Sequence, residues 1–257
     1  TDATGNPVDT PETEVDEFLV NTTTSSNQQY PSVTELSDGG FVVVWEDASN
    51  NDGSNYGVFG QRFNADGSKD GTEFIVNETT ANDQLSPSVA ALKDGGFAVT
   101  WQADYQDDDG NAVHNIYGQR YDEDGVALDA PETSAGEFLI NTYTDADQNS
   151  PSITGGGFVV TWQSSSTQDS GDTSGWSVQA QMYDATGAKT GGEFLVNTYT
   201  SSEQVSPSTT ALLDGGFVVT WQDQSGHDGG SGWDIRGQRY DASGNTFGDE
   251  LLVNTYT

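Results

Sequence analysis

The chain has 257 residues, of which 41 are acidic and only 7 basic, so its formal net charge is −34. This charge excludes nucleic acid and anionic membranes as partners, because both require a surface of Lys and Arg. No apolar run approaches the length of a membrane span, so no membrane insertion is expected. Divalent cations are the partners that the charge favours, and Ca²⁺ is the expected cofactor because it takes carboxylate and carbonyl oxygens.

The location is predicted from the same composition. There is no cysteine, which excludes disulfides and thiolate metal sites without deciding the compartment. Self-repulsion of this size destabilises a compact fold unless salt or bound cations offset it. A saline or calcium-rich setting fits, and the protein is therefore expected to be secreted or on the cell surface.

In chain order, the first recognisable element is a short apolar segment at residues 17–22, Glu-Phe-Leu-Val-Asn-Thr. It recurs with small changes from Glu73, Glu137, Glu193 and Glu250. Four strands are expected in the first unit, at residues 31–36, 40–46, 57–63 and 74–77. Turns of Asp and Gly separate them, since Asp bonds its own backbone and Gly accepts positive φ.

The second of these strands carries the most regular pattern. Its sequence, Gly-Gly-Phe-Val-Val-Val-Trp, returns three times in nearly the same letters and ends at Trp45, Trp101, Trp162 and Trp221. In the first copy Phe41, Val43 and Trp45 lie on one face, and valines lie on the other. Both faces are apolar, so each sheet is expected to be covered on both sides, with the tryptophans in the core.

Tandem four-stranded antiparallel units covered on both faces predict an all-β fold, a β-propeller with four blades of four antiparallel strands. A tandem β-sandwich array is the alternative. The propeller would be a single domain over residues 1–257, with units at about 17–72, 73–136, 137–192 and 193–249 and an extra terminal strand at 250–257. We expect a closed ring in which residues 18–21 or 251–254 form the outermost strand of the last blade.

The third unit departs from this pattern. Its Pro151 to Phe158 segment is three residues shorter than Pro31 to Phe41, so a tighter first hairpin is expected. Met182 also stands where the other units have Arg62, Arg120 and Arg239. These arginines are expected to pair with a repeated acid such as Asp122 or Asp241.

The turn and core residues carry a family resemblance. Pro-Ser opens each unit, Asp-Gly-Gly leads into strand two, and Tyr-Asp-Ala-x-Gly closes strand three. This order resembles the TolB-like propeller repeat and the tandem repeats of very large secreted bacterial proteins of the RTX and adhesin kind. The resemblance implies the fold more than an activity, because its motifs are turn and core residues.

Acidic residues gather in the loops between strands two and three, which antiparallel connectivity places at one face of the fold. Carboxylates on Gly-bearing loops suit Ca²⁺, so eight are predicted as metal ligands. The alternative is a solvated acidic face that confers solubility in salt. The predicted ligands are Asp47, Asp52, Asp107, Asp109, Asp169, Asp172, Asp228 and Asp234.

One of these loops, residues 229–235, matches the calcium nonapeptide of RTX proteins. It is a single copy, and the equivalent stretch at residues 174–178 lacks the Asp. The family's site is carried over only to Asp234, and chance similarity in a Gly-rich loop is the favoured explanation.

The residue before strand three is aromatic or imidazole in every unit: Tyr56, His114, Trp176 and Trp233. Exposed rings beside polar loops stack on sugars, so these four are candidate glycan-binding residues. The alternative is that they cap the hydrophobic edge of each blade.

Catalytic motifs are weak. The two histidines, His114 and His227, occupy non-equivalent repeat positions, and no nucleophile or metal-binding motif accompanies them. The sequence therefore predicts a non-enzymatic extracellular calcium-binding module, structural or adhesive, within a larger repeat protein. A glycan-binding lectin is the second hypothesis and a polysaccharide-acting enzyme the third. Glycans and other copies of itself are the expected macromolecular partners.

Overall fold

The computed structural model describes residues 17–53, 55–106, 110, 112–131, 136–165, 172, 175–227 and 232–255. The regular elements in this part of the chain are all β-strands, and they form four sheets. The described residues contain no helix with the length and apolar character that a membrane span needs. The predicted all-β class is confirmed.

The four sheets follow one another along the sequence. The first contains β1 (Gln28–Glu35), β2 (Phe41–Asp47), β3 (Gly57–Phe63) and β4 (Lys69–Ile75). The second contains β5 (Gln84–Ala91), β6 (Phe97–Gln106), β7 (Ala112–Tyr121), β8 (Ala127–Leu128) and β9 (Phe138–Leu139). The third contains β10 (Gln148–Thr154), β11 (Val159–Ser164), β12 (Ser177–Tyr183) and β13 (Lys189–Leu195). The fourth contains β14 (Gln204–Ala211), β15 (Phe217–Asp223), β16 (Asp234–Tyr240) and β17 (Leu251–Leu252).

Within each sheet the strands are antiparallel and in chain order. The second sheet has a fifth strand because β8 and β9 both pair with β7 and together take the outermost place. Each sheet is therefore a meander of neighbouring hairpins, as the turn residues predicted.

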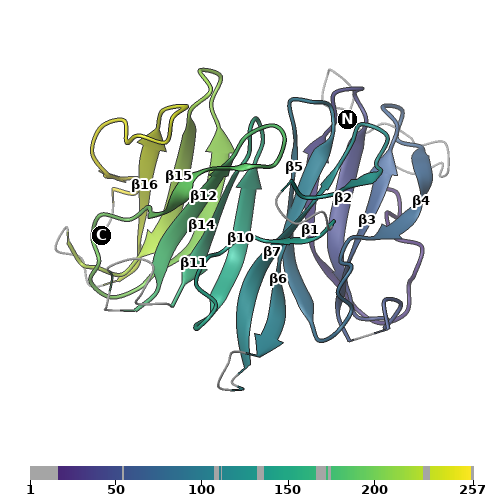
Figure 1. Cartoon of the computed structure of the whole chain (residues 1–257), viewed down its shortest axis with the longest axis horizontal. Helices are drawn as coiled ribbons and strands as arrows, with labels where there is room; N and C mark the ends of the chain where they lie inside the picture. Colours follow the sequence, from purple (N-terminus) through teal and green to yellow (C-terminus); the bar gives the residue numbers. More distant parts are fainter. Residues whose placement is uncertain are drawn as a thin grey trace.

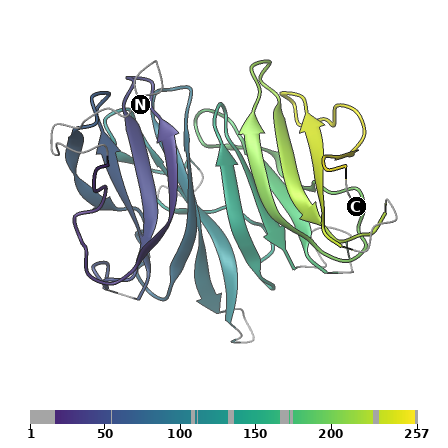
Figure 2. The ribbon, with the colours of Figure 1, turned by 180° about the vertical axis from the view of Figure 1, so that it is seen from behind.

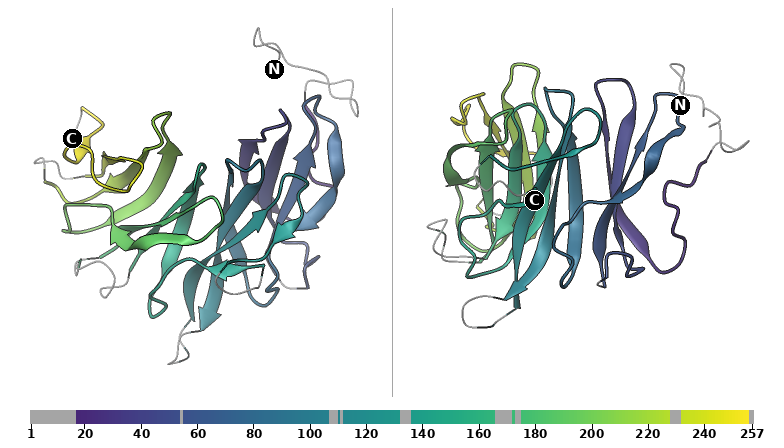
Figure 3. Two further views of the ribbon diagram at one scale, coloured as in Figure 1. Left: turned by 45° about the horizontal axis from the view of Figure 1, so that its top comes forward. Right: turned by 45° about the vertical axis from the view of Figure 1, so that its right-hand side comes forward.

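The sheets stand side by side in a curved row, with the first and last at opposite ends (Figure 1 and, from behind, Figure 2). Consecutive sheets pack through their first strands, β1 on β5, β5 on β10 and β10 on β14. In the described part of the chain no comparable packing joins β14 to β1. The predicted closed ring is thus an open arc in this structure, as the tilted view shows (Figure 3).

The hydrophobic core is divided into layers between sheets. One cluster joins Val42, Val44 and Val58 of the first sheet to Phe97 and Trp101 of the second. Equivalent clusters join the second sheet to the third and the third to the fourth. An array of separate sandwiches would enclose a core within each unit, so the shared layers argue against that alternative.

The four repeated tryptophans are buried, as predicted. Trp101, Trp162 and Trp221 lie in the layers between sheets, whereas Trp45 packs on the outer face of the first sheet. Trp45, Trp101, Trp162 and Trp221 are at most 3% exposed. Trp101 Nε1 donates to Gln84 Oε1 at 3.1 Å, and Trp162 Nε1 donates to Gln148 Oε1 at 2.9 Å. The repeated Gln at the start of each first strand therefore has a structural role.

The first strands differ from the prediction in one respect. Tyr30, Ser86, Ser150 and Ser206 each precede a proline and have φ between 52° and 54°. The pairing register shifts at each of them, so every first strand contains a β-bulge and begins before the predicted start at Pro31. The extra residue interrupts strict alternation, which hides this part of the strand from pattern analysis.

Two arginines of the third strands join neighbouring sheets, and their acid partners differ from those expected. Arg120 lies 3.1 Å from Asp94 and donates to the backbone oxygens of Ala185 and Thr186 in the next sheet. Arg62 donates to Glu123 O in the same way, at 2.9 Å. Each arginine has the Asp of its own Asp-Gly-Gly turn within 4 Å, and Arg62 also lies 3.4 Å from Asp70. A repeated acid is therefore used, as expected, but it is not Asp122 or Asp241.

Candidate functional site

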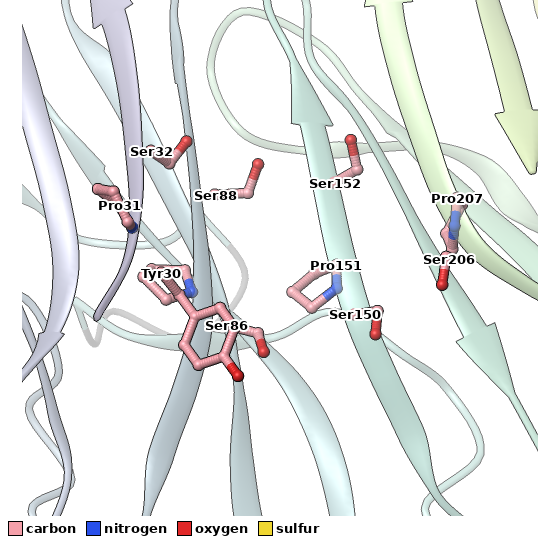
Figure 4. Close-up of a pocket in the computed structure, with 11 residues that line it drawn as sticks. Tyr30, Pro31, Ser32, Ser86, Ser88, Ser150, Pro151, Ser152, Ser206 and Pro207 are labelled. Carbon is pink, nitrogen blue, oxygen red and sulfur yellow. The ribbon is translucent and has the colours of Figure 1, made fainter.

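The clearest hollow on the molecule is a groove along the concave side of the row, lined by the four first strands. It encloses about 470 Å³, and Figure 4 shows its walls. The first three of these strands each contribute the bulge residue, a proline and a serine, and β14 contributes the bulge residue and the proline. The lining residues are Tyr30, Pro31, Ser32, Ser86, Pro87, Ser88, Ser150, Pro151, Ser152, Ser206 and Pro207.

The bulges hold these walls in place. In the left-handed conformation, the bulge residues of the second, third and fourth sheets turn their N–H groups toward the sheet before. Ser150 N donates to Gln102 Oε1 at 3.0 Å, and Ser206 N donates to Gln163 Oε1 at 2.9 Å. Ser86 N donates to the carboxylate of Glu46 at the equivalent place. The groove is therefore built from rigid strands rather than loops.

The serine hydroxyls are partly used and partly available. Ser32 Oγ accepts the N–H of Val89 at 3.2 Å, and Ser152 Oγ accepts the N–H of Thr209 at 3.0 Å. A hydroxyl that accepts one bond keeps its own proton to donate. A row of hydroxyl donors thus runs along the groove, with Tyr30 at one end, 63% exposed.

No lining residue is charged. Hydroxyls, prolyl rings and one phenol match a neutral, hydroxyl-rich ligand better than an anion or a cation. They also include no group that titrates near neutral pH, so proton transfer to a ligand would need side chains from outside the groove.

One group of titratable side chains lies close by, on the face formed by the loops between strands two and three. His114 Nε2 lies 3.0 Å from Asp104 Oδ1, and its Nδ1 lies 3.0 Å from Asp147 Oδ1. Burial raises the pKa of Asp104, and the neighbouring Asp83 and Asp147 raise it further against the opposing effect of His114. Asp83 and Asp147 lie only three residues before the groove residues Ser86 and Ser150.

A second carboxyl with a raised pKa is Glu46, which is 1% exposed. Burial is the main cause, and its bonds to Ser86 and Gln29 oppose the shift. The next two sheets have Gln102 and Gln163 at this place, with the same bond to a bulge residue. Glu46 therefore resembles a structural residue of the junction more than a catalytic one.

The described members of the predicted calcium set do not converge. Asp47 accepts the N–H of Ser49 at 2.6 Å, Asp52 accepts Asn77 Nδ2 at 3.3 Å, and Asp234 accepts Asn254 Nδ2 at 3.0 Å. Asp172 is buried in the third sheet's loop. Across the described residues, no three His, Asp or Glu side chains are grouped to hold a metal. The other four predicted ligands, Asp107, Asp109, Asp169 and Asp228, lie outside the described residues, as do residues 229–231 of the nonapeptide loop.

The predicted aromatic set is not gathered either. Tyr56, His114 and Trp176 are half-buried, Trp233 is 48% exposed, and none of them lines the groove. The backbone N–H of Trp176 donates to Glu203, which precedes the next sheet. Tyr56 O likewise accepts the N–H of Gln84, and His114 contacts Asp147, so three of the four residues lie at junctions with the following sheet.

Sequence reasoning missed the groove residues although a signal was present. Proline occurs in every first strand with Ser after it, and with Ser before it in three copies. In the sequence these residues mark the start of each unit, and Ser and Pro by themselves indicate no binding chemistry.

Comparisons with known proteins give a fold and no family. No protein-family model matches the chain, and no curated protein matches it. The TolB-like resemblance therefore stays a prediction.

Among solved structures, the chain resembles three carbohydrate-active enzymes. An alpha-L-arabinanase from Penicillium chrysogenum, complexed with arabinobiose, is 13% identical with a TM-score of 0.57, over 90% of this chain and 68% of that one. An N-acetylgalactosamine deacetylase from F. plautii, in complex with blood group B trisaccharide, is 12% identical with a TM-score of 0.56, over 93% and 73%. The GH93 alpha-L-arabinofuranosidase of Fusarium graminearum is 11% identical with a TM-score of 0.54, over 91% and 69%.

These likenesses support a propeller-like all-β fold. They also correct the function predicted from the sequence, because these three structures of similar fold are enzymes that act on carbohydrate. The expectation of a non-enzymatic, calcium-binding adhesive module is therefore overturned.

Proposed function

We propose that the chain is a carbohydrate-active protein that binds a neutral oligosaccharide along the groove of its four first strands. The observation that carries the proposal is the uncharged lining of hydroxyls, prolyl rings and Tyr30, built on rigid strands. The fold's likeness to an arabinanase bound to arabinobiose and to a deacetylase bound to a blood group trisaccharide supports the same class of ligand. We also infer that the four sheets are blades of a propeller.

We propose hydrolysis of a glycosidic bond as the activity to test. Such hydrolysis uses a carboxyl with a raised pKa as the acid and a second carboxyl as base or nucleophile. Asp104 is the better acid candidate, because its pKa is raised and its side chain is 38% exposed at the loop face. Asp147, held by the same imidazole, is the second carboxyl of this group.

Binding is tested first, by calorimetry with arabinobiose, blood group B trisaccharide and a panel of neutral oligosaccharides. Tyr30→Ala should weaken the binding of a ligand that the wild type takes by several-fold, since an exposed ring supplies stacking at the end of the groove. Tyr105→Ala is the matched control, because Tyr105 is 45% exposed and lies outside the groove. Equal effects of the two variants, or no binding by the wild type, would refute the groove as the site.

Activity is tested separately, by release of reducing ends from neutral polysaccharides. Asp104→Asn should abolish release while leaving binding in place. Glu46→Gln should retain it, because glutamine already occupies this place in the next two sheets. If the wild type binds oligosaccharides but releases no reducing ends, the proposal of hydrolysis is refuted and the proposal of binding in the groove stands.

A further inference from the structure

The three junctions between consecutive sheets use the same apolar contacts. The Phe, Val and Trp of each second strand pack against the opposite face of the sheet before. That opposite face always includes an aliphatic residue five positions before the aromatic that ends the third strand: Val58, Ile116 and Val178, each 0% exposed. Each sheet thus has two different faces, and at each junction the Phe, Val and Trp face of one sheet meets the opposite face of the sheet before.

Polar contacts repeat with the same order. The glutamate that opens the repeated Glu-Phe-Leu-Val-Asn segment accepts a backbone N–H from the end of that segment in the sheet before. Thr142 N donates to Glu193 Oε2 at 2.8 Å, and Thr198 N donates to Glu250 Oε2 at 2.7 Å. The junction is therefore specified by hydrogen bonds as well as by apolar packing.

On the last sheet, no described strand of another sheet packs against one of these faces. Ile235, at the place of Val58 and Ile116, is 39% exposed, and Leu251 and Val253 beside it are 49% and 51% exposed. Gln222, at the place of the bonded Gln102 and Gln163, is exposed. The equivalent face of each of the first three sheets is buried at a junction, whereas that of the last sheet is open.

Arg239 shows the same lack of a neighbour. Arg62 and Arg120 reach the turn of the following sheet, where they lie against Gly125 and Gly187. Arg239 instead folds back over the ring of Phe247, 4.2 Å from its centroid. Its side chain is 37% exposed and pairs with Asp214 of its own sheet.

The first sheet presents the other kind of face, the one with Phe, Val and Trp, and this face is also only partly covered. Val33 of β1 is 63% exposed, whereas Val89 and Ile153 at the same place are 6% and 5% exposed. A hollow of about 140 Å³ lies beside Trp45, where a preceding sheet's strands would pack. The face is covered only in part, by Phe18 and Val20.

Residues 17–22 take the place that the outermost strand of a preceding sheet would have. Thr22 N donates to Glu73 Oε2 at 2.7 Å, which repeats the bond that Thr142 and Thr198 make at later junctions. Phe18 meets Phe63 edge to face at 5.4 Å between centroids, as Phe74 meets Tyr121 at 5.5 Å. This segment lacks only a third strand to pair with.

The last sheet offers a suitable third strand. In earlier sheets a Phe of the outermost strand covers a glycine: a Cβ on Gly60 would lie 2.6 Å from the Phe74 ring, and one on Gly118 would lie 3.0 Å from Phe138. In the last sheet the outermost strand offers Gly237 only Leu251, 3.7 Å from a Cβ placed there, and the nearest side-chain atom is Thr220 Cγ2 of β15, at 3.3 Å. Phe18 would fill this place more fully than the chain's own β17.

We propose that the open face of the last sheet binds the first sheet of a second copy of this chain, head to tail, with residues 17–22 of that copy replacing β17 as its outermost strand. The partner follows from the molecule's own junctions, since the two incomplete faces are the two kinds that every junction joins. Arg239 would then reach the turn of the second copy that ends at Gly67, as Arg120 reaches the turn at Gly187.

The test is the mass of the chain in solution, by light scattering and sedimentation from micromolar to millimolar concentration. The solution should be saline, because a net charge of −34 opposes association at low ionic strength. The wild type should associate, and its mass should rise with concentration. Ile235→Arg should remain a monomer with an unchanged melting temperature, because this side chain is already partly exposed.

Val126→Arg is the matched control, since Val126 is 59% exposed on the second sheet's outer turn. It should associate like the wild type. Val33→Arg blocks the first sheet instead, so a mixture of the Val33→Arg and Ile235→Arg chains should form a dimer that grows no further. A monomeric wild type, a control that fails equally, or a mixture that stays monomeric would each overturn the proposal.

Discussion

Replacing Trp101 with alanine tests the layered core most directly. Trp101 is 0% exposed and packs between the first and second sheets, against Val42, Val44 and Val58. Removing a buried Trp side chain costs about 3–5 kcal/mol, because the cavity is only partly refilled. The variant also leaves Gln84 Oε1 without its donor, which adds about 1–3 kcal/mol if no water replaces it.

The assay is urea unfolding followed by circular dichroism, with the midpoint and slope compared between variants. Phenylalanine substitutions separate the two contributions. Trp101→Phe loses a hydrogen bond and a small volume, whereas Trp45→Phe loses a similar volume without a bond, because Trp45 Nε1 has no partner among the described residues. The first variant should therefore be less stable than the second by about 1 kcal/mol.

A Trp101→Ala variant that loses less than about 1 kcal/mol would contradict the shared core, since a side chain packed between two sheets cannot be removed so cheaply. Equal losses in the two phenylalanine variants would contradict the role given to Gln84 alone and leave the core intact.

Three further outcomes are expected. Asn141→Ala should lower stability by about 1–3 kcal/mol in the same unfolding assay, because it leaves the N–H of Ile116, now bonded at 2.7 Å, buried without an acceptor. Burial raises the pKa of Glu46 above its usual 4.5. The contribution of the protonated Glu46 to folding stability is therefore complete below pH 4.5 and is lost as the pH rises through the raised pKa. Glu46→Gln should accordingly be more stable than the wild type toward neutral pH, and no more stable in acid. Sodium chloride should raise the melting temperature by screening the net charge of −34, and only a larger rise with CaCl₂ at matched ionic strength would support the predicted calcium sites.

Much of the sheet structure was predictable because it depends on local patterns. The expected third strand, residues 57–63, matches β3, and the second differs from β2 by one residue at each end. Apolar residues on both faces correctly predicted coverage on both sides for the second and third sheets, which each have two neighbours, but not for the first and last sheets. The start of β1 was missed because Tyr30 has a left-handed backbone before Pro31, which no alternation pattern reveals.

The site was not predictable by the same means. The groove exists only because four first strands lie side by side, and the angle between sheets that places them there is set by packing. Charged and aromatic loop residues are the usual ligand-binding types and were therefore predicted as the site. The groove is instead lined by Ser, Pro and one Tyr, and Ser and Pro occur throughout turns and loops without binding ligands. Ring closure failed as a prediction for the same reason, since no pattern along the chain specifies that angle.

The strictly pairwise order of the junctions has a mechanical consequence. Extensive packing between sheets in the described chain joins only consecutive sheets, so pulling the two ends apart would load the junctions in series. The last sheet has one junction and an open face, and should yield first. Each further sheet would then unfold in a separate event, and the force–extension trace should show a series of force peaks rather than a single rupture.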